Sequence, residues 1–370
     1  MTSQKKRILQ IVPAMSKESG VMRYVWNMMS GSNEEEFEFD FLYHIPSKIS
    51  FEKEAMASGS RMIQAPNVAK DPIGYIRYVN RFIGGEAYRY SIVHCHVPNT
   101  AFCVLRAAAN AGIKTRIIHS HLATSSEHLV RRIRNYPLIK YGKRFATHNF
   151  ACSEEAGRYL FGRKPFRVFR NGIDVDKFRY DEEAARILKG QVLTNPSAFP
   201  VIGCVGRLAK QKNYPFMLKV FQELLKTENH AELIIAGSGP EEEKIMRLVM
   251  QMGLQQKVHI LGIREDVNKL YSVMDVLAMP SLCEGLPVAA VEAQAAGLRC
   301  VFSCDVPAEA DIANVSSFVD RSAPLSEWSC ALMDSALKGR NPDGEKSVAD
   351  AGYSLKSSSA LLLDFYRSVA

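Results

Sequence analysis

The chain has 370 residues, of which 47% are hydrophobic, enough for two domains that each have a core. No run approaches the roughly 20 consecutive apolar residues of a membrane-spanning helix. The 8 cysteines form neither a CxxC pair nor a metal-ligand spacing, so we expect the protein to lie in a reducing cytoplasm and to have no structural zinc. The formal net charge of +8 is uneven: residues 1–175 hold 26 Lys/Arg and 14 Asp/Glu (net +12), and the remainder holds 21 and 25 (net −4).

Short apolar strands alternate with amphipathic helices along the whole chain. The start, MTSQKKRILQIV, has no small-residue cleavage site and is interpreted as a first strand rather than a signal peptide. In the first half the predicted strands are RILQIV, FDFLYHI, RMIQA, SIVHCHV, TRIIHSH and HNFACS, and the predicted helices include 20–29 and 100–112. In the second half the predicted strands are PVIGCVG, ELIIAG, VHILG, DVLAMP and RCVFS, and the predicted helices include 214–227 and 240–253.

This alternation predicts an α/β fold with a parallel, doubly wound sheet in each half. Residues 176–198 are predicted to form an irregular or partly helical connection, which makes them the natural domain boundary. Rossmann-like domains bind ligands at the carboxyl ends of their strands. The motifs described next all lie at such ends or just after them.

The stretch CEGLPVAAVE places two carboxylates around a helix start. Pro287 suits the first helical turn, and neither Gly285 nor Leu286 offers a side-chain oxygen to cap the free amides, so this helix end can bind an anion. Glu292 lies inside an otherwise apolar helix, where its carboxylate could accept hydrogen bonds from the adjacent hydroxyls of a sugar or ribose. The alternative is structural, with Glu284 capping the helix and Glu292 paired with a neighbouring cation.

The stretch VGRLAKQKN supplies cations at another strand end. Gly206 ends the strand, and Arg207 and Lys212 follow in the loop, where two fixed cations can balance a diphosphate. The alternative, surface cations near a helix start, is disfavoured by the helix dipole. A Walker loop and a GxGxxG fingerprint are both absent from the sequence, which argues against a P-loop ATPase and a classical NAD site. AGSGPEEEK is interpreted as a tight turn, because its three glutamates would repel phosphate.

Polar residues at strand ends in the first half form a second candidate site. Gly20 lies between the first strand and its helix, where the backbone could approach a phosphate or sugar. His94 and His96 in VHCHVPN, and His119 and His121 in IIHSHLA, form two pairs, each on one side of a strand. HxH pairs without a nearby carboxylate make a poor zinc motif. We therefore favour one histidine as a polar contact to a reacting sugar, and the alternative is a set of satisfied strand-end histidines.

The densest basic stretch is RRIRNYPLIKYGKRF, residues 131–145, in which six cations alternate with aromatic and aliphatic residues. It is either a solvated helix face or a contact with an anionic membrane or a phosphate-bearing acceptor. No recognised nucleic-acid motif accompanies it, so a nucleic-acid partner is not expected.

Taken together, GRLAKQKN, AGSGP, LGIREDV, MDVLAMPSLCEGLPVAAVEAQAAG and RNGID resemble the retaining GT-B glycosyltransferases of family 4 in order and spacing. The EAQAAGL form is similar to bacterial capsule and exopolysaccharide transferases. The resemblance implies two Rossmann-like domains facing across a cleft, with an acceptor-side domain at 1–175, a nucleotide-sugar donor domain at 176–352 and a last helix at 353–370 that crosses back to the first domain.

The resemblance also implies an activity. Such enzymes move a sugar from a nucleotide donor, here a UDP-sugar in preference to a GDP-sugar, to a saccharide or lipid-linked saccharide acceptor, with retention of the anomeric configuration. They need no divalent metal and no further cofactor, because protein cations and helix amides hold the diphosphate. The expected location is the cytoplasm, with peripheral contact of the basic first domain to the inner membrane face.

Residue roles carry over position by position. Arg207 and Lys212 would bind the donor phosphates, Glu284 the hydroxyls of the transferred sugar, Glu292 the ribose, and His121 the donor sugar at the reacting centre. The further residues implied for donor binding are Gly20 and Gly206 near the phosphates, Ile263 and Arg264 at the base, and Gly285, Leu286, Pro287 and Val288 at the helix amides.

Two other functions fit parts of this pattern. A nucleotide-sugar 2-epimerase shares the architecture, but the EGLP stretch with its spaced glutamate favours transfer. A non-catalytic partner that binds nucleotide sugar has no need for all four of Arg207, Lys212, Glu284 and Glu292.

Overall fold

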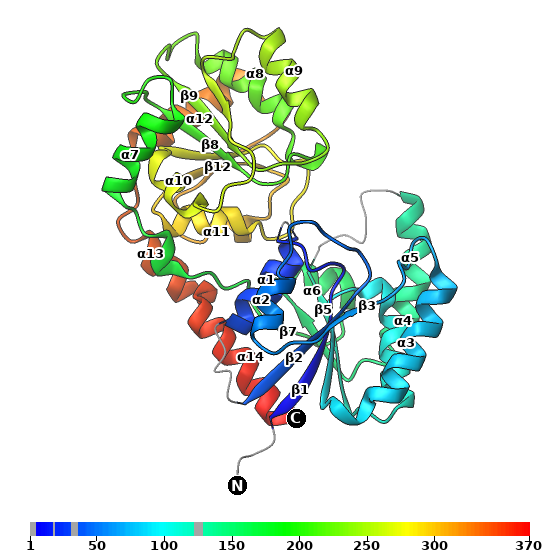
Figure 1. Cartoon of the computed structure of the whole chain (residues 1–370). Helices are drawn as coiled ribbons and strands as arrows, with labels where there is room; N and C mark the ends of the chain where they lie inside the picture. Colours follow the sequence, from blue (N-terminus) through cyan, green and yellow to red (C-terminus); the bar gives the residue numbers. More distant parts are fainter. Residues whose placement is uncertain (1–4, 18, 31–35, 122–128) are drawn as a thin grey trace. The chain divides into compact units, whose positions relative to one another are not determined.

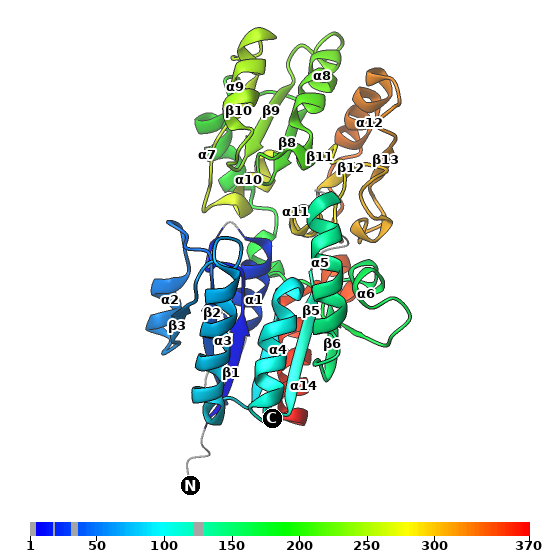
Figure 2. The same ribbon diagram turned by 90° about the vertical axis from the view of Figure 1, so that its right-hand side faces the viewer.

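The computed structural model describes residues 5–17, 19–30, 36–121 and 129–370. The chain divides into two compact units: unit 1 comprises Met1–Gly172 and Leu355–Ala370, and unit 2 comprises Ile173–Ser354. Each unit has its own parallel sheet with helices on both faces (Figures 1 and 2), which confirms the predicted α/β fold class with two doubly wound Rossmann-like domains. Among the described residues, no helix is long and apolar enough to cross a membrane.

The sheet of unit 1 has seven strands in the order β3-β2-β1-β4-β5-β6-β7. The strands are β1 (Lys6–Ile11), β2 (Phe37–Tyr43), β3 (Met62–Gln64), β4 (Ile92–Cys95), β5 (Thr115–Ser120), β6 (His148–Ala151) and β7 (Arg167–Val168). The helices are α1 (Gly20–Ser30), α2 (Glu52–Ala57), α3 (Pro72–Glu86), α4 (Ala101–Asn110), α5 (Leu129–Gly142), α6 (Glu154–Phe161) and α14 (Leu355–Val369). Six of the seven strands match predicted ones, and the two-residue β7 is the addition.

Two apolar cores lie on opposite faces of this sheet. One joins the strands to α3, α4 and α6, and the other joins them to α1 and α14 (Figure 1). The last helix therefore belongs to unit 1, where Leu362, Phe365 and Tyr366 are buried against the sheet although all of unit 2 precedes them in the chain.

The sheet of unit 2 has six strands in the order β10-β9-β8-β11-β12-β13. The strands are β8 (Val201–Val205), β9 (Glu232–Ala236), β10 (Val258–Ile260), β11 (Val276–Met279), β12 (Arg299–Ser303) and β13 (Ser317–Val319). The helices are α7 (Glu182–Val192), α8 (Tyr214–Leu224), α9 (Glu242–Gln251), α10 (Val267–Val273), α11 (Val288–Ala295), α12 (Leu325–Leu337) and α13 (Gly344–Val348). One core lies under α7, α10 and α11, and the other under α8, α9 and α12. The stretch predicted as a partly helical connection contains α7.

Side-chain caps set where several helices begin. Asp71, Ser153 and Asp181 accept hydrogen bonds from backbone amides of the first turns of α3, α6 and α7. At α3 the cap needs a glycine, because a Cβ on Gly74 would lie 1.9 Å from Asp71 Oδ2. Such caps satisfy amides that the helix itself leaves without a partner.

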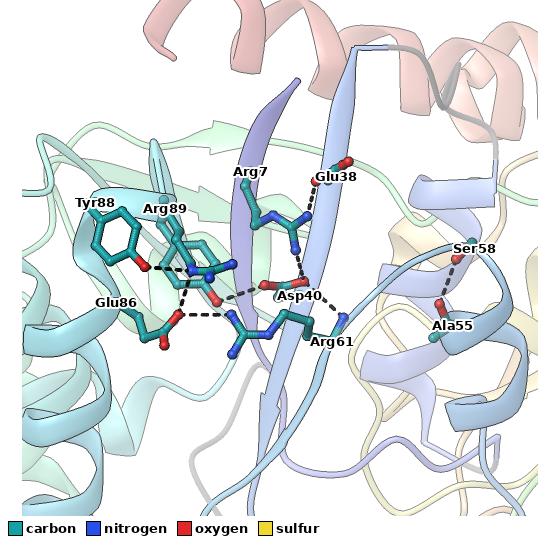
Figure 3. Close-up of polar contacts among 10 residues, drawn as sticks. Arg7, Glu38, Asp40, Ala55, Ser58, Arg61, Glu86, Tyr88 and Arg89 are labelled. Atoms are coloured by element: carbon teal, nitrogen blue, oxygen red, sulfur yellow. Dashed lines mark hydrogen bonds and ion pairs between the residues drawn. The ribbon is translucent and has the colours of Figure 1, made fainter. Parts of the chain in front are cut away.

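A buried carboxylate ties three strands of unit 1 to α3 at the edge opposite the strand carboxyl ends (Figure 3). Asp40 in β2 is fully buried and accepts hydrogen bonds from Arg7 Nη1 (2.9 Å), the backbone amide of Arg61 (3.0 Å) and the hydroxyl of Tyr90 (2.8 Å). Arg61 in turn contacts Glu86 at the end of α3. Every oxygen of Asp40 is satisfied, so we assign this cluster a structural role.

Candidate active site

The candidate donor site lies at the carboxyl edge of the unit 2 sheet. Strand order reverses between β8 and β11, and such switch points are where doubly wound sheets bind ligands. The loops that follow β8, β9, β10 and β11 are joined there by backbone hydrogen bonds. These are Leu208 N to Ser238 O (2.8 Å), Gly237 N to Gly262 O (2.7 Å) and Leu282 N to Gln211 O (2.7 Å).

Two glycines allow these loops to lie close together. Gly206 and Gly237 have φ angles of 146° and 139°, which side chains of L-residues rarely permit. A Cβ on Gly237 would lie 2.0 Å from the carbonyl oxygen of Gly206. Gly206, expected near the donor phosphates, is therefore required by the local backbone in any case, and its carbonyl accepts a hydrogen bond from the Tyr214 hydroxyl (3.0 Å).

Lys212 and Glu284 meet across the switch point. Lys212 Nζ lies 2.8 Å from Glu284 Oε1, and the two side chains are only 17% and 8% exposed. Gln211 fixes the Glu284 loop by donating to the Cys283 carbonyl (2.7 Å). Asn213 fixes the Lys212 loop through its left-handed backbone (φ 57°) and a bond from its amide to the Pro280 carbonyl (3.2 Å). The structure thus brings together two of the predicted site residues as a preformed, largely buried ion pair.

Three other predicted residues lie in loops at the same edge of the sheet and form no ion pair or hydrogen bond with this pair in the described part of the chain. Arg207 is exposed on the loop after β8. Ile263 is 45% exposed after β10, and Arg264 forms a two-pronged ion pair with Asp266, with N–O distances of 2.8 and 2.7 Å. Asp266 therefore already pairs with the guanidinium of Arg264, so a ligand would contact the backbone of this segment rather than the Arg264 side chain.

The helix end beside Glu284 lacks a side-chain cap, as predicted. Helix α11 begins at Val288 after Pro287, and in the described part of the chain no side-chain cap is found at its start. The alternative that Glu284 caps this helix is wrong, because its carboxylate pairs with Lys212 instead. Gly285 and the buried Leu286 lie in the turn that leads into the helix. The helix dipole and the Lys212 ammonium are thus positioned beside one another.

Glu292 is buried in α11, with 7% of its surface exposed. Its Oε2 accepts a hydrogen bond from the hydroxyl of Tyr271 in α10 (2.8 Å). The hydroxyl of Tyr271 thus stabilises the carboxylate within the protein before any ligand arrives. Sequence reasoning missed Tyr271, because a tyrosine in a short helix carries no local signal of its partner.

In unit 1 the four histidines gather around the ends of β4 and β5. The rings of His94 and His96 stack with centroids 4.1 Å apart, and so do those of His119 and His121. This confirms that each pair lies on one side of its strand. Nitrogens of His94, His96 and His119 lie within 4.8 Å of one another, but these rings form hydrogen bonds with other side chains or with each other. We therefore describe them as a hydrogen-bonded cluster.

Burial keeps this cluster neutral. Desolvation lowers the pKa of His121 to about 3 and holds the pKa values of His94, His96 and His119 well below the ordinary range. Gly20 is the first residue of α1, and a Cβ added to it would meet no atom of the described residues within 4 Å. Local packing therefore gives no reason for a glycine at that position.

Comparison with known proteins gives these sites a family. Residues 19–177 match the family described as Glycosyltransferase Family 4, and residues 199–321 match Glycosyl transferases group 1. The putative glycosyltransferase EpsF of Bacillus subtilis (strain 168) is 30% identical, over 99% of this chain and 97% of its own length. An Escherichia coli protein named UDP-Gal:alpha-D-GlcNAc-diphosphoundecaprenol alpha-1,3-galactosyltransferase is 26% identical over 58% of each chain.

Solved structures share the fold at low sequence identity. Anabaena Alr3699/HepE in complex with UDP matches with a TM-score of 0.77 and 16% identity, over 99% of this chain and 100% of that one. The lipopolysaccharide outer core galactosyltransferase WaaB matches with a TM-score of 0.67 over 98% and 99%. This chain is a glycosyltransferase that belongs to family 4 and has the GT-B fold, because a relative matches it over nearly its full length, two regions match glycosyltransferase families, and it has two Rossmann-like units.

Proposed function

We propose that the protein transfers a sugar, with retention of configuration and without a divalent metal, from a UDP-sugar to a saccharide or lipid-linked saccharide during surface polysaccharide synthesis. The observation that carries this proposal is the Lys212–Glu284 pair at the β8–β11 switch point, beside the uncapped start of α11. Two similar proteins support the nucleotide and the acceptor class: one is named for UDP-Gal and a diphosphoundecaprenol acceptor, and the other was solved in complex with UDP.

The chemistry follows from the charges. The acceptor oxygen bonds to the anomeric carbon, the bond from that carbon to the phosphate oxygen breaks, and the acceptor proton passes to a donor phosphate oxygen on the same face. The leaving diphosphate gains negative charge, which Arg207, Lys212 and the amides at the start of α11 stabilise. Because Lys212 turns toward phosphate, Glu284 becomes available to accept hydrogen bonds from sugar hydroxyls. Glu292 accepts them from the ribose, and His121 contacts the sugar.

Metal-free nucleotide binding tests the donor site. We expect calorimetry in EDTA to show that UDP binds more tightly than GDP, ADP and dTDP. Arg207→Ala should weaken UDP binding about 10- to 100-fold, because hydrogen bonds between charged groups contribute roughly 1.5–3 kcal/mol. Lys219→Ala, which removes an exposed cation from α8, is the matched control and should change nothing. Binding that requires a divalent metal, or that survives Arg207→Ala, would contradict the proposal.

The basic stretch gives a second proposal, peripheral contact with an anionic membrane. On α5 and just after it, Ile133 (66%), Tyr136 (67%) and Tyr141 (40%) are exposed beside the exposed cations Lys140 and Arg144. Arg131 and Arg132, which belong to the same predicted stretch, have side chains outside the described part of the structure. Apolar rings flanked by cations are typical of segments that lie on an anionic lipid surface.

We expect Lys140→Gln/Arg144→Gln to weaken binding to anionic vesicles about 30-fold, because each cation near such a surface contributes about 1 kcal/mol. Co-sedimentation with phosphatidylglycerol-containing vesicles measures this. Lys219→Gln/Arg247→Gln removes the same charge from exposed positions in unit 2 and is the control. The membrane proposal fails if the wild-type protein does not sediment with these vesicles, or if both double variants lose binding equally.

A further inference from the structure

The histidine cluster of unit 1 is connected to the last helix through one amide, that of Gln10 in β1. Gln10 Oε1 lies 2.8 Å from His96 Nε2, and Gln10 Nε2 lies 3.4 Å from the hydroxyl of Tyr366 in α14. The Gln10 side chain is 2% exposed and Tyr366 is 1% exposed. A buried primary amide has one end that only accepts and one that only donates hydrogen bonds. The Gln10 amide therefore decides which group donates and which accepts in each of the two series of hydrogen bonds that start from it. We call these series the first and the second chain.

The first chain ends at His121. Because Gln10 Oε1 can only accept, the proton of neutral His96 lies on Nε2, and His96 Nδ1 is an acceptor. His121 Nε2 lies 2.8 Å from this Nδ1 and must donate to it. Neutral His121 then carries its single proton on Nε2, and its Nδ1 has a free lone pair.

The second chain of hydrogen bonds starts from the other end of the Gln10 amide, its Nε2. The Tyr366 hydroxyl accepts from Gln10 Nε2 and donates to His94 Nδ1 at 2.6 Å, and His94 Nε2 donates to His119 Nδ1 at 3.1 Å. The chain then requires the proton of His119 on Nε2. Burial holds the pKa of His119 well below its ordinary value, so its ring carries a single proton, and its Nε2 has no hydrogen-bond partner among the residues that the structure describes.

We propose that Tyr366 of α14, acting through Gln10 and His96, is a positioning residue that holds His121 as the Nε2–H tautomer with a bare Nδ1. His121 then recognises its ligand as a hydrogen-bond acceptor, suited to a sugar hydroxyl, and it neither donates a proton nor carries charge. The sugar hydroxyl rests on the proposed function, whereas the tautomer rests on unit 1 alone. Reversal of the Gln10 amide would reverse both chains and place the proton on His121 Nδ1, which turns the same ring into a donor.

The tautomer can be read directly from long-range ¹H–¹⁵N correlation spectra of the full chain labelled with ¹⁵N-histidine. A His121→Gln spectrum assigns the signal. We expect the Nε2–H tautomer of His121 in the wild-type protein at pH 7 without nucleotide. In Tyr366→Phe the Gln10 amide loses the acceptor that orients it, and we expect the ratio of Nε2–H to Nδ1–H tautomer to fall about fivefold or more, the equivalent of one hydrogen bond.

Tyr24 provides a matched control. Its ring packs edge-on against His121 with centroids 4.9 Å apart, but its buried hydroxyl has no hydrogen-bond partner among the described residues. Tyr24→Phe should therefore leave the tautomer unchanged. An Nδ1–H tautomer in the wild-type protein overturns the inference even if Tyr366→Phe does not fold, and so does a folded Tyr366→Phe protein with an unchanged ratio. Loss of metal-free UDP binding would instead overturn the proposed function, because the spectra are recorded without nucleotide.

Discussion

Lys212→Ala is expected to lower kcat/KM about 10²- to 10³-fold, measured as release of nucleoside diphosphate from the sugar donor that calorimetry identifies. A single donor that stabilises developing charge contributes on this scale. The effect has a second source, because Glu284 is 8% exposed and would lose the cation that pairs with it. An uncompensated carboxylate beside a diphosphate repels it.

Substitution of Glu284 separates these two contributions. Glu284→Gln keeps the cation and removes a competing anion, so UDP should bind several-fold more tightly while release of nucleotide from the sugar donor slows. Lys212→Ala/Glu284→Gln should recover UDP binding relative to Lys212→Ala, but not the rate. If Glu284→Gln instead weakens UDP binding, the carboxylate does not compete with phosphate for Lys212, and the proposed exchange of partners is wrong.

Acidification is expected to unfold unit 1 before unit 2. Unfolded histidines titrate near pH 6.5, whereas burial lowers the pKa of His121 to about 3 and those of His94, His96 and His119 well below the ordinary value. The unfolded state therefore binds more protons in this window, and the free energy of unfolding falls as the pH falls below 6.5. Each histidine contributes about 1.4 kcal/mol per pH unit, so four contribute about 5 kcal/mol per unit.

The two tryptophans make the comparison measurable, because Trp26 lies in α1 of unit 1 and Trp328 lies in α12 of unit 2. Trp328→Phe leaves a fluorescence reporter of unit 1, and Trp26→Phe leaves a reporter of unit 2. Unit 2 is described throughout and holds only His230 and His259, with no histidine cluster. With stabilities of about 5–15 kcal/mol per domain, we expect loss of the Trp26 signal near pH 5. A stability of unit 1 that stays constant from pH 7 to 5 would contradict this.

The fold was largely predictable because it depends on local periodicity. Eleven apolar runs became strands. The two-residue β7 is too short to leave a periodic signal, whereas β13 is as long as the predicted β3 and β10 but was not predicted. The sequence also placed Lys212 and Glu284 in loops that follow strands, and these strands turn out to be neighbours, β8 and β11, but the ion pair between the two side chains was not predicted. Residues at the carboxyl ends of neighbouring parallel strands share one edge of the sheet.

Side-chain partners distant in sequence were not predictable. Nothing in the sequence of α10 indicates that Tyr271 bonds to Glu292, and nothing near the end of the chain indicates that Tyr366 bonds to His94, 272 positions earlier. Such contacts depend on which faces two elements present after packing. The same holds for Asp40, whose three partners come from β1, the start of β3 and the segment after α3.

Unit 1 is formed by two separate segments of the chain, and this has a consequence for its synthesis on the ribosome. Its α14 segment follows the 182 residues from Ile173 to Ser354, which form unit 2. At about 5–20 residues per second, roughly 10–40 s of translation separate the two parts of unit 1. Until then the sheet face that α14 covers, including Ile8, Phe150 and Phe169, lacks its helix. Synthesis of unit 2 is therefore complete before that of unit 1. During this interval the nascent chain exposes an apolar surface of unit 1 to which chaperones can bind.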